Sequence, residues 1–268
     1  MGKYLAQTKP DDVDLEQTWY TNPVEGYHLD ICVKSQVLYV LERSKPDLII
    51  HLAAQGSVDF AETHFTETHY INVIGLLNVL SANIPTVYIS TNAVFGGDYP
   101  PYSEKSETYP VNNYGLIKKE AEAKVMATQD WMIIRPFLLY GYPYPGGRQN
   151  WLTTILDKLS KGAVIRLVND TYWQPTNAAD CAVAIWSIVV WGGLNEIYHV
   201  ASDDRVTLYQ FGRKIAELWG YDPEMVQPIS SKDLSIAPRP KDTTFDLSKI
   251  HGMGIKLKGL EEGLMVLK

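Results

Sequence analysis

Short apolar runs alternate with helical patterns through the first half of the chain, and this alternation constrains the fold more than any other sequence feature. The runs Asp47–Leu52, Thr86–Ser90 and Trp131–Pro136 have the length and composition of strands that are buried on both faces. Apolar residues recur at helical spacing between Thr66 and Ile84, and a second helical pattern covers Asn113–Met126. Strands that alternate with helices pair in parallel through right-handed crossovers. The sequence therefore predicts an open, parallel α/β sheet covered by helices on both faces.

The regular alternation ends at Tyr140. A turn-rich segment, Gly141–Gly147, follows, and the rest of the chain holds further helical patterns separated by short strand patterns. Ligands of open α/β sheets bind beyond the carboxyl ends of the strands, so a smaller C-terminal portion is expected to close over that edge. We expect residues 1–140 to form a Rossmann-like, doubly wound domain and residues 141–268 to form mainly a substrate-binding portion, partly interleaved with the sheet.

The strand and glycine-rich turn with which a dinucleotide-binding fold begins are not evident in the sequence. Met1–Gln7 already has the pattern of the first helix, and Val13–Tyr20 fits the second strand. Gly2 is either the last glycine of such a turn or an ordinary residue near the terminus. The first strand is central, and losing roughly four or five buried apolar residues would cost about 6–15 kcal/mol, close to a whole domain's stability. We therefore expect either a start-site truncation or another segment in the central position.

A Tyr-x-x-x-Lys motif, from Tyr114 to Lys118, lies on the predicted helix Asn113–Met126. Residues four apart share a helix face, so the phenol and the ammonium point into the same space. An ammonium beside a phenol lowers its pKa from about 10, which suits a general acid or base near neutral pH. The spacing alone also arises by chance, so its surroundings decide its meaning.

The surroundings place a hydroxyl group near this motif. Ser90 ends a predicted strand and Thr91 follows it, so the Thr91 hydroxyl lies at the carboxyl edge of the sheet. There it could hydrogen-bond a substrate carbonyl while Tyr114 supplies a proton, although a turn or capping role would explain Thr91 taken singly. We predict Thr91, Tyr114 and Lys118 as the catalytic set.

Five motifs in order along the chain resemble those of the extended short-chain dehydrogenases/reductases, and most closely the dTDP-4-dehydrorhamnose reductase family. They are Leu52–Ala54 with Val58–Glu62, Ile89–Phe95, Pro101–Tyr102 with Tyr114–Lys118, Val168–Thr176, and Arg239–Pro240 with Phe245–Lys249. The resemblance implies an NAD(P)-binding Rossmann-like domain and an oxidoreductase that acts on a sugar nucleotide.

The resemblance also implies roles for individual residues. Tyr114 would donate a proton, Lys118 would tune its pKa and bind the cofactor ribose, and Thr91 would bind the carbonyl. The residues implied to bind the cofactor are Gly2, Asp30, Ile31, Ala53, Ala54 and Ser90, together with Tyr114 and Lys118. The residues implied to bind the substrate are Val58, Asn92, Asn150, Trp173 and Arg239.

Because of two departures from the family pattern, the sequence does not identify the sugar of the substrate. Asn92 stands where the family has Asp, and Leu138 stands where the rhamnose enzymes carry a Trp that stacks on the sugar. The choice between NADP(H) and NAD(H) depends on Thr21 and Asn22, which follow the second strand. No acidic residue is present there to accept a ribose 2′-hydroxyl of NAD(H). No arginine is present there for a 2′-phosphate either. We expect NADP(H), with NAD(H) as the alternative.

Composition excludes several other classes of function. The formal net charge is −7 and the sequence pI is about 5.4, which argues against binding to nucleic acid or to anionic membranes. No apolar run is long enough to span a membrane. The cysteines, Cys32 and Cys181, form neither a metal motif nor a disulfide scaffold, so we expect a reducing cytoplasm and no metal site.

The leading hypothesis is therefore NADPH-dependent reduction of a 4-keto-6-deoxy sugar nucleotide, with Tyr114 as the proton donor. One alternative is a non-catalytic regulatory subunit of the same fold, similar to the β subunit of methionine adenosyltransferase. Another is an NAD-dependent epimerase or dehydratase of the same superfamily. A homodimer is one assembly that the resemblance allows.

Overall fold

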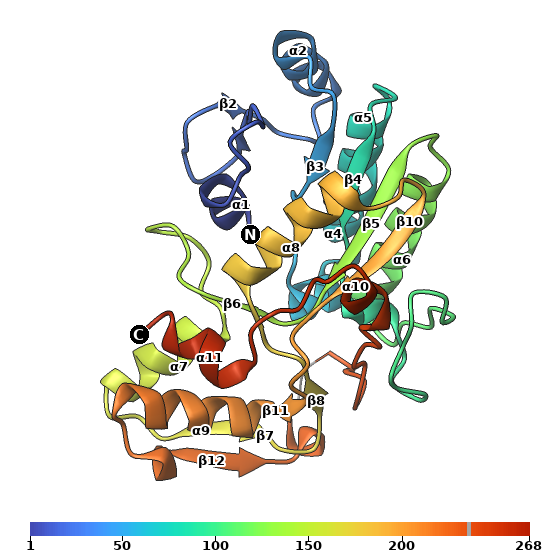
Figure 1. Ribbon diagram of the computed structural model, residues 1–268. Coiled ribbons are helices and arrows are strands. Elements are labelled where there is room, and N and C mark those ends of the chain that lie inside the picture. The colour runs from blue at the N-terminus through green and yellow to red at the C-terminus, as the bar shows by residue number, and fades with distance from the viewer. Residues whose placement is uncertain (235–236) are drawn as a thin grey trace.

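A four-stranded parallel sheet forms the centre of the computed structural model, which describes residues 1–234 and 237–268 (Figure 1). Its strands are β3 (Ile49–His51), β4 (Thr86–Ile89), β5 (Trp131–Pro136) and β10 (Glu196–Val200), in the spatial order β10-β5-β4-β3. Three of these strands fall within the apolar runs that predicted them. The parallel α/β sheet expected from the sequence is therefore confirmed.

Two further parallel strands pair with each other beside this sheet. β1 (Thr18–Trp19) pairs with β2 (Tyr27–His28), and within the described residues neither strand pairs with β3. The parallel strands thus form two groups, β1-β2 and β3-β4-β5-β10. The predicted second strand, Val13–Tyr20, is shorter in the structure and comprises only β1.

Helices cover both faces of the four-stranded sheet. On one face, α6 (Asn113–Met126) and α5 (Gly75–Leu80) bury Tyr88 and Ile133 against their apolar side chains. On the opposite face, α8 (Ala178–Trp191) and α1 (Gly2–Gln7) cover Val87, Met132 and Ile134. Neighbouring strand residues point to opposite faces, so this division follows from the strand geometry. The doubly wound arrangement is confirmed.

The helical pattern between Thr66 and Ile84 is divided in the structure. It comprises α4 (Phe65–His69), a π-helical turn (Tyr70–Ile74) and α5. By contrast, α6 has the bounds that the sequence predicts. It begins at Asn112, whose side-chain oxygen accepts a hydrogen bond from the Gly115 amide at 2.9 Å.

The second half of the chain contributes to two layers. β10 and α8 complete the main sheet and its cover, whereas a separate apolar core lies among α7 (Trp151–Ser160), α9 (Leu208–Trp219) and α11 (Leu260–Met265) (Figure 1). The parallel strands of this second layer are β7 (Ile165–Val168) and β12 (Val226–Ile229). The remaining regular elements are α2 (Lys34–Ser44), α3 (Val58–Thr63), β6 (Leu139–Tyr140), β8 (Tyr172–Trp173), β9 (Thr176–Asn177), β11 (Val206–Thr207) and α10 (Ser248–Gly252). Within residues 1–234 and 237–268, no helix has the length and apolar character needed to cross a membrane.

Candidate active site

The predicted catalytic residues meet where β4 ends beside the first turns of α6. Thr91 follows β4, and its hydroxyl caps a short 3-10 turn by accepting a hydrogen bond from the Ala93 amide at 3.2 Å. A Cβ atom at Gly115 would collide with the Ala93 carbonyl, so the glycine allows this turn and α6 to approach closely. Tyr114, which precedes Gly115, is thereby held against Thr91.

The local environment keeps the Tyr114 phenol protonated. Its pKa is raised to about 12, mainly by desolvation, while a hydrogen bond with Thr91 and the positive charge of Arg148 oppose the rise. The sequence predicted the opposite direction, because it placed the Lys118 ammonium beside the phenol. The raised pKa suits Tyr114 to donate a proton at neutral pH.

Lys118 is buried one helical turn farther along α6, with its side chain directed to β4. Its ammonium donates a hydrogen bond to the Ile89 carbonyl at 2.7 Å and lies 4.0 Å from the centre of the Tyr88 ring. Desolvation lowers the pKa of Lys118 to about 7, and the charge of Glu122 acts in the opposite direction. The expected lowering of the Tyr114 pKa is therefore wrong for a physical reason: desolvation is the largest influence on the phenol, and the Lys118 ammonium is itself buried and bonded to the Ile89 carbonyl.

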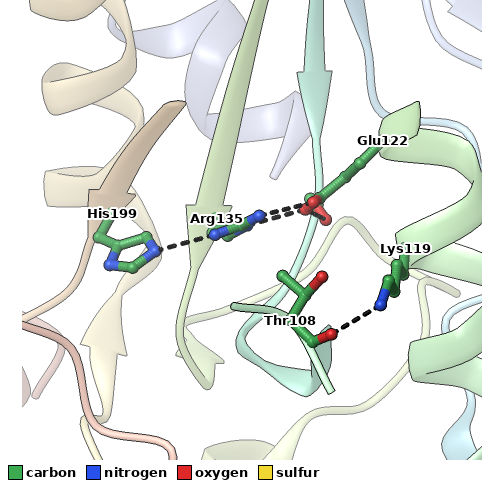
Figure 2. Close-up of polar contacts among 6 residues, drawn as sticks. Thr108, Lys119, Glu122, Arg135 and His199 are labelled. Carbon is green, nitrogen blue, oxygen red and sulfur yellow. Dashed lines mark hydrogen bonds and ion pairs between the residues drawn. The ribbon is translucent and has the colours of Figure 1, made fainter. Parts of the chain in front are cut away.

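A buried ion pair joins α6 to β5 (Figure 2). Arg135 of β5 donates to both carboxylate oxygens of Glu122, through Nε at 2.8 Å and Nη2 at 2.6 Å. Ser90 donates to the same carboxylate at 2.5 Å, and His199 lies 3.3 Å from Arg135 Nη1. The Ser90 hydroxyl, predicted to line the cofactor, is therefore engaged inside the protein. Figure 2 also shows Lys119 bound to the Thr108 carbonyl, which ties the loop before α6 to the helix.

Two buried polar atoms near Lys118 lack hydrogen-bond partners within the described part of the chain. His51 stacks on Tyr88, and within the described residues neither His51 Nε2 nor the Tyr88 hydroxyl has a hydrogen-bond partner. Desolvation lowers the pKa of His51 to about 4, and Lys118 adds to this effect. His51 is therefore neutral near pH 7.

The other residues predicted to bind a cofactor follow the carboxyl ends of the parallel strands or begin α1. Ala53 and Ala54 lie exposed just after β3, and Gly2 lies close to Leu52, where an added Cβ would make an ordinary contact. Asp30 and Ile31 follow β2, where the Asp30 carboxylate accepts a hydrogen bond from the Cys32 amide at 2.9 Å. A hollow of about 540 Å³ lies beyond β1 and is lined by residues that include Asn22 and Tyr144. Small exposed residues after β3, with a hollow at the end of β1, fit an extended dinucleotide cofactor.

A second pocket, of about 430 Å³, has basic and aromatic walls. Among the predicted substrate residues, Trp173 and Arg239 line it. Its other lining residues with a charge or an indole ring are Asp59, Trp151, Lys158, Arg166 and Lys232. The lining thus includes four cationic residues and one acidic residue, although the protein as a whole is acidic, and most of the other lining residues are apolar. Such walls suit a ligand with a phosphate group and a flat ring.

The remaining predicted substrate residues have contacts within the protein. Asn92 donates to the Thr243 hydroxyl at 2.8 Å. Asn150 caps α7 through the amides of Leu152 and Thr153 and donates to the Gly141 carbonyl at 2.6 Å. Val58 begins α3, directly before the pocket residue Asp59. The pocket lining does not include Asn92, Asn150 or Val58.

Sequence reasoning missed several residues of this region. Arg148, directly after the turn-rich segment, acts on Tyr114 by its charge and reaches towards Gly56, and no motif singled it out. Asp59 lies within a motif quoted for the family resemblance, but only the structure pairs it with Arg239. Glu122 follows Lys118 by four residues, and that helical spacing could have identified it.

Comparisons with known proteins agree with this fold. The family described as "RmlD substrate binding domain" matches residues 7–267. Among curated relatives, dTDP-4-dehydrorhamnose reductase of Mycolicibacterium smegmatis is 31% identical over 218 residues, which cover 78% of this chain and 65% of the relative. Methionine adenosyltransferase 2 subunit beta of Xenopus laevis is 26% identical over 239 residues, covering 85% of this chain and 71% of the relative.

A solved structure matches nearly the whole chain. The dTDP-4-dehydrorhamnose reductase of Bacillus anthracis, in complex with NADP, superposes with a TM-score of 0.84 at 30% sequence identity. The match covers 99% of this chain and 94% of that one.

Proposed function

Because the chain belongs to the RmlD substrate-binding domain family, we propose that it reduces the keto group of a 4-keto-6-deoxy sugar nucleotide with NADPH. The observation that carries this proposal is the pairing of Tyr114 with Thr91 at the carboxyl edge of the sheet, with the Tyr114 pKa raised to about 12. A phenol that stays protonated at neutral pH is the acid that carbonyl reduction needs. The similarity to a reductase solved with NADP supports the choice of cofactor.

In the proposed reaction, the substrate carbonyl oxygen accepts hydrogen bonds from Thr91 and Tyr114. NADPH, when bound, supplies the hydride. Tyr114 then transfers its proton to the developing alkoxide and is left as a phenolate. The Thr91 hydroxyl and the Arg148 charge both favour that phenolate, since both lower the pKa of Tyr114. The protonated form of Lys118, on the same face of α6, adds a positive charge nearby.

Three residues of the predicted cofactor set would hold the nicotinamide half. Ala53 and Ala54 have side chains small enough to leave the backbone after β3 accessible. Lys118 would bind the ribose hydroxyls, as the resemblance implies. Gly2, Asp30 and Ile31 would contact the adenosine half at the ends of the strands nearer β2.

The basic pocket would hold the nucleoside diphosphate of the substrate. Arg239, Arg166 and the two lysines would neutralise the phosphates, and the indole of Trp151 or Trp173 would stack on the base. Asn92, Asn150 and Val58 would act from the side of the pocket nearer the catalytic residues.

The test measures NADPH oxidation at 340 nm with a panel of 4-keto sugar nucleotides. Wild-type protein is expected to oxidise NADPH with at least one of them, and Tyr114→Phe is expected to lose that activity. Tyr109→Phe is the matched control, since Tyr109 is 71% exposed. Undiminished turnover by Tyr114→Phe would remove the proposed mechanism.

The similarity to methionine adenosyltransferase 2 subunit beta supports a second candidate, a non-catalytic subunit that binds a larger enzyme. This candidate predicts no NADPH oxidation with any sugar nucleotide and co-purification with a catalytic partner. An epimerase or dehydratase would instead retain NAD through turnover and consume none. The oxidation assay therefore separates the reductase from both alternatives, and conversion of the sugar nucleotide with retained NAD separates these two from each other.

A further inference from the structure

The buried ion pair between Glu122 and Arg135 lies in an environment where charge is costly. Both side chains are 2% exposed, and two charges removed from water lose several kcal/mol of hydration each. Apolar side chains of similar size often stabilise a core equally well. The pair therefore calls for an explanation other than stability.

The contacts of Glu122 tie three elements together. Its carboxylate joins α6 to the end of β4 through Ser90 and to β5 through Arg135 (Figure 2). Ser90 directly precedes Thr91, and Lys118 lies one helical turn before Glu122. Thr91 is thus one residue from a hydrogen-bond partner of this carboxylate, whereas Lys118 and Tyr114 lie one and two helical turns before Glu122 on α6.

A second contact holds the far side of Arg135. The Arg135 Nη1 atom lies 3.3 Å from His199 Nε2, and His199 Nδ1 lies 3.1 Å from the Tyr102 carbonyl. Desolvation and the Arg135 charge lower the pKa of His199 well below its usual value, so the ring is neutral. A neutral ring that donates from Nδ1 to the carbonyl accepts at Nε2 from Arg135. The guanidinium is therefore fixed from both sides.

We propose that Glu122 is a positioning residue for the reduction, an inference that rests on the proposed function. Its carboxylate holds the Ser90–Thr91 strand end against α6 and supplies the negative charge that faces Lys118.

The groups around Lys118 explain why this charge matters. Lys118 is faced by Glu122 from α6, by Tyr88 from β4 and by His51 from β3, and Tyr114 of α6 lies near Tyr88. Arg135 on β5 and His199 on β10 lie beyond Glu122. Tyr88 and His51 are neutral near pH 7, because burial raises the pKa of the former and lowers that of the latter. Among these groups, Glu122 is the only carboxylate.

The decisive experiment is the pH profile of kcat/KM for Glu122→Gln. Gln keeps the size of the side chain and removes its charge, so Lys118 loses its proton at lower pH. We expect activity within about threefold of wild type at pH 6 and a loss of about tenfold or more at pH 8, which corresponds to a shift of one pKa unit. Glu120→Gln is the matched control, because Glu120 lies on the exposed side of α6 and pairs with His69. Its profile is expected to match wild type.

Glu122→Gln leaves Arg135 buried without its charged partner and could therefore lose activity by unfolding. A second variant controls for this. Glu122→Met/Arg135→Met removes both charges and is expected to stay folded by circular dichroism. We expect its kcat to fall at least tenfold with KM changed less than threefold, because the strand end and α6 lose their tie. Folded variants with wild-type kcat and pH profile overturn this proposal. Wild-type protein that oxidises no NADPH overturns the proposed function instead, so the two failures are distinct.

Discussion

Arg239 Nη2 contacts both carboxylate oxygens of Asp59, at 3.0 and 2.9 Å, although the two residues are 180 positions apart in the sequence. Asp59 also accepts a hydrogen bond from the Ala237 amide at 3.2 Å. Both side chains of the pair line the basic pocket, so the contact fastens the segment after residue 236 to α3 at the pocket wall. It also aligns the guanidinium beside the space that the proposed diphosphate would fill.

Arg239→Ala is expected to weaken binding of dTDP by about tenfold or more, the range for a charge-assisted hydrogen bond of 1.5–3 kcal/mol. The measurement is quenching of tryptophan fluorescence, since Trp151 and Trp173 line the same pocket. Arg213→Ala is the control, because Arg213 pairs with Glu224 outside the pocket lining. Equal affinities for Arg239→Ala and wild type would exclude the residue from phosphate binding.

Tyr114→Phe is expected to lower kcat by about 10²–10⁴-fold, the usual contribution of a general acid. NADPH affinity, measured by fluorescence titration, is expected to change less than threefold, because the ring and its packing remain. A variant that loses affinity and turnover together would indicate a structural role for the hydroxyl.

Gly115→Ala is expected to lower both stability and activity. The added Cβ would collide with the Ala93 carbonyl, so α6 must move away from the turn that follows Thr91. We expect a loss of about 1–3 kcal/mol in the free energy of unfolding, typical of overpacking, and a fall in kcat. Gly252→Ala is the control, since no atom lies within 4 Å of its added Cβ. Urea unfolding followed by circular dichroism measures the difference.

The buried Lys118 is expected to make stability depend on pH in the alkaline range. Its pKa is about 7 in the folded protein and about 10.4 in an unfolded chain, so the unfolded state binds more protons between these values. Stability contributed by this group therefore rises with pH over that window. Lys118→Met is expected to flatten the rise by about 1.4 kcal/mol per pH unit within this window, whereas Lys124→Met on the exposed side of α6 is expected to leave it unchanged. Urea unfolding at pH 7, 8 and 9 tests this, and parallel slopes for Lys118→Met and wild type would contradict it.

His51 is expected to make the stability of the protein depend on pH in the acid range. Its pKa is lowered to about 4 from an ordinary value of 6.5, so acid favours the unfolded state, which binds the proton more readily. The stability that neutral His51 contributes is fully present above pH 6.5. It is lost as the pH falls, and the loss is roughly 3 kcal/mol at pH 4. His51→Asn should show a smaller loss of stability between pH 6.5 and pH 4 than wild type. A mutant with the same acid dependence would assign that dependence to other groups.

The sequence predicted the elements whose signals are local. The bounds of β5 and α6 agree with the apolar run and the helical pattern, and Asn112 supplies a capping side chain at the start of α6. The π-helical turn Tyr70–Ile74 was not predicted, because its side chains keep an apolar pattern that an unbroken α-helix would also show.

The sequence predicted only part of the candidate site, because its signals are local. Residues at the ends of predicted strands, such as Thr91, could be placed by topology alone. The direction of the Tyr114 pKa could not, because it depends on how deeply α6 is buried and on a lysine that bonds to the Ile89 carbonyl of another element. The partners of Glu122 are likewise on other strands, and sequence spacing gives no information about them.

The completion of the main sheet by β10 and α8 has a consequence for biosynthesis. Val87 and Met132 are buried under α8, so these side chains stay exposed on the nascent chain until residues 178–191 have been made. The sheet cannot close before translation has passed Val200, and its pairing of β5 with β10 joins segments far apart along the chain. Such distant pairing slows folding, and exposed strand edges favour aggregation meanwhile. Ribosome-bound chaperones should therefore have more influence on the yield of this protein than on one whose sheet is complete within its first half.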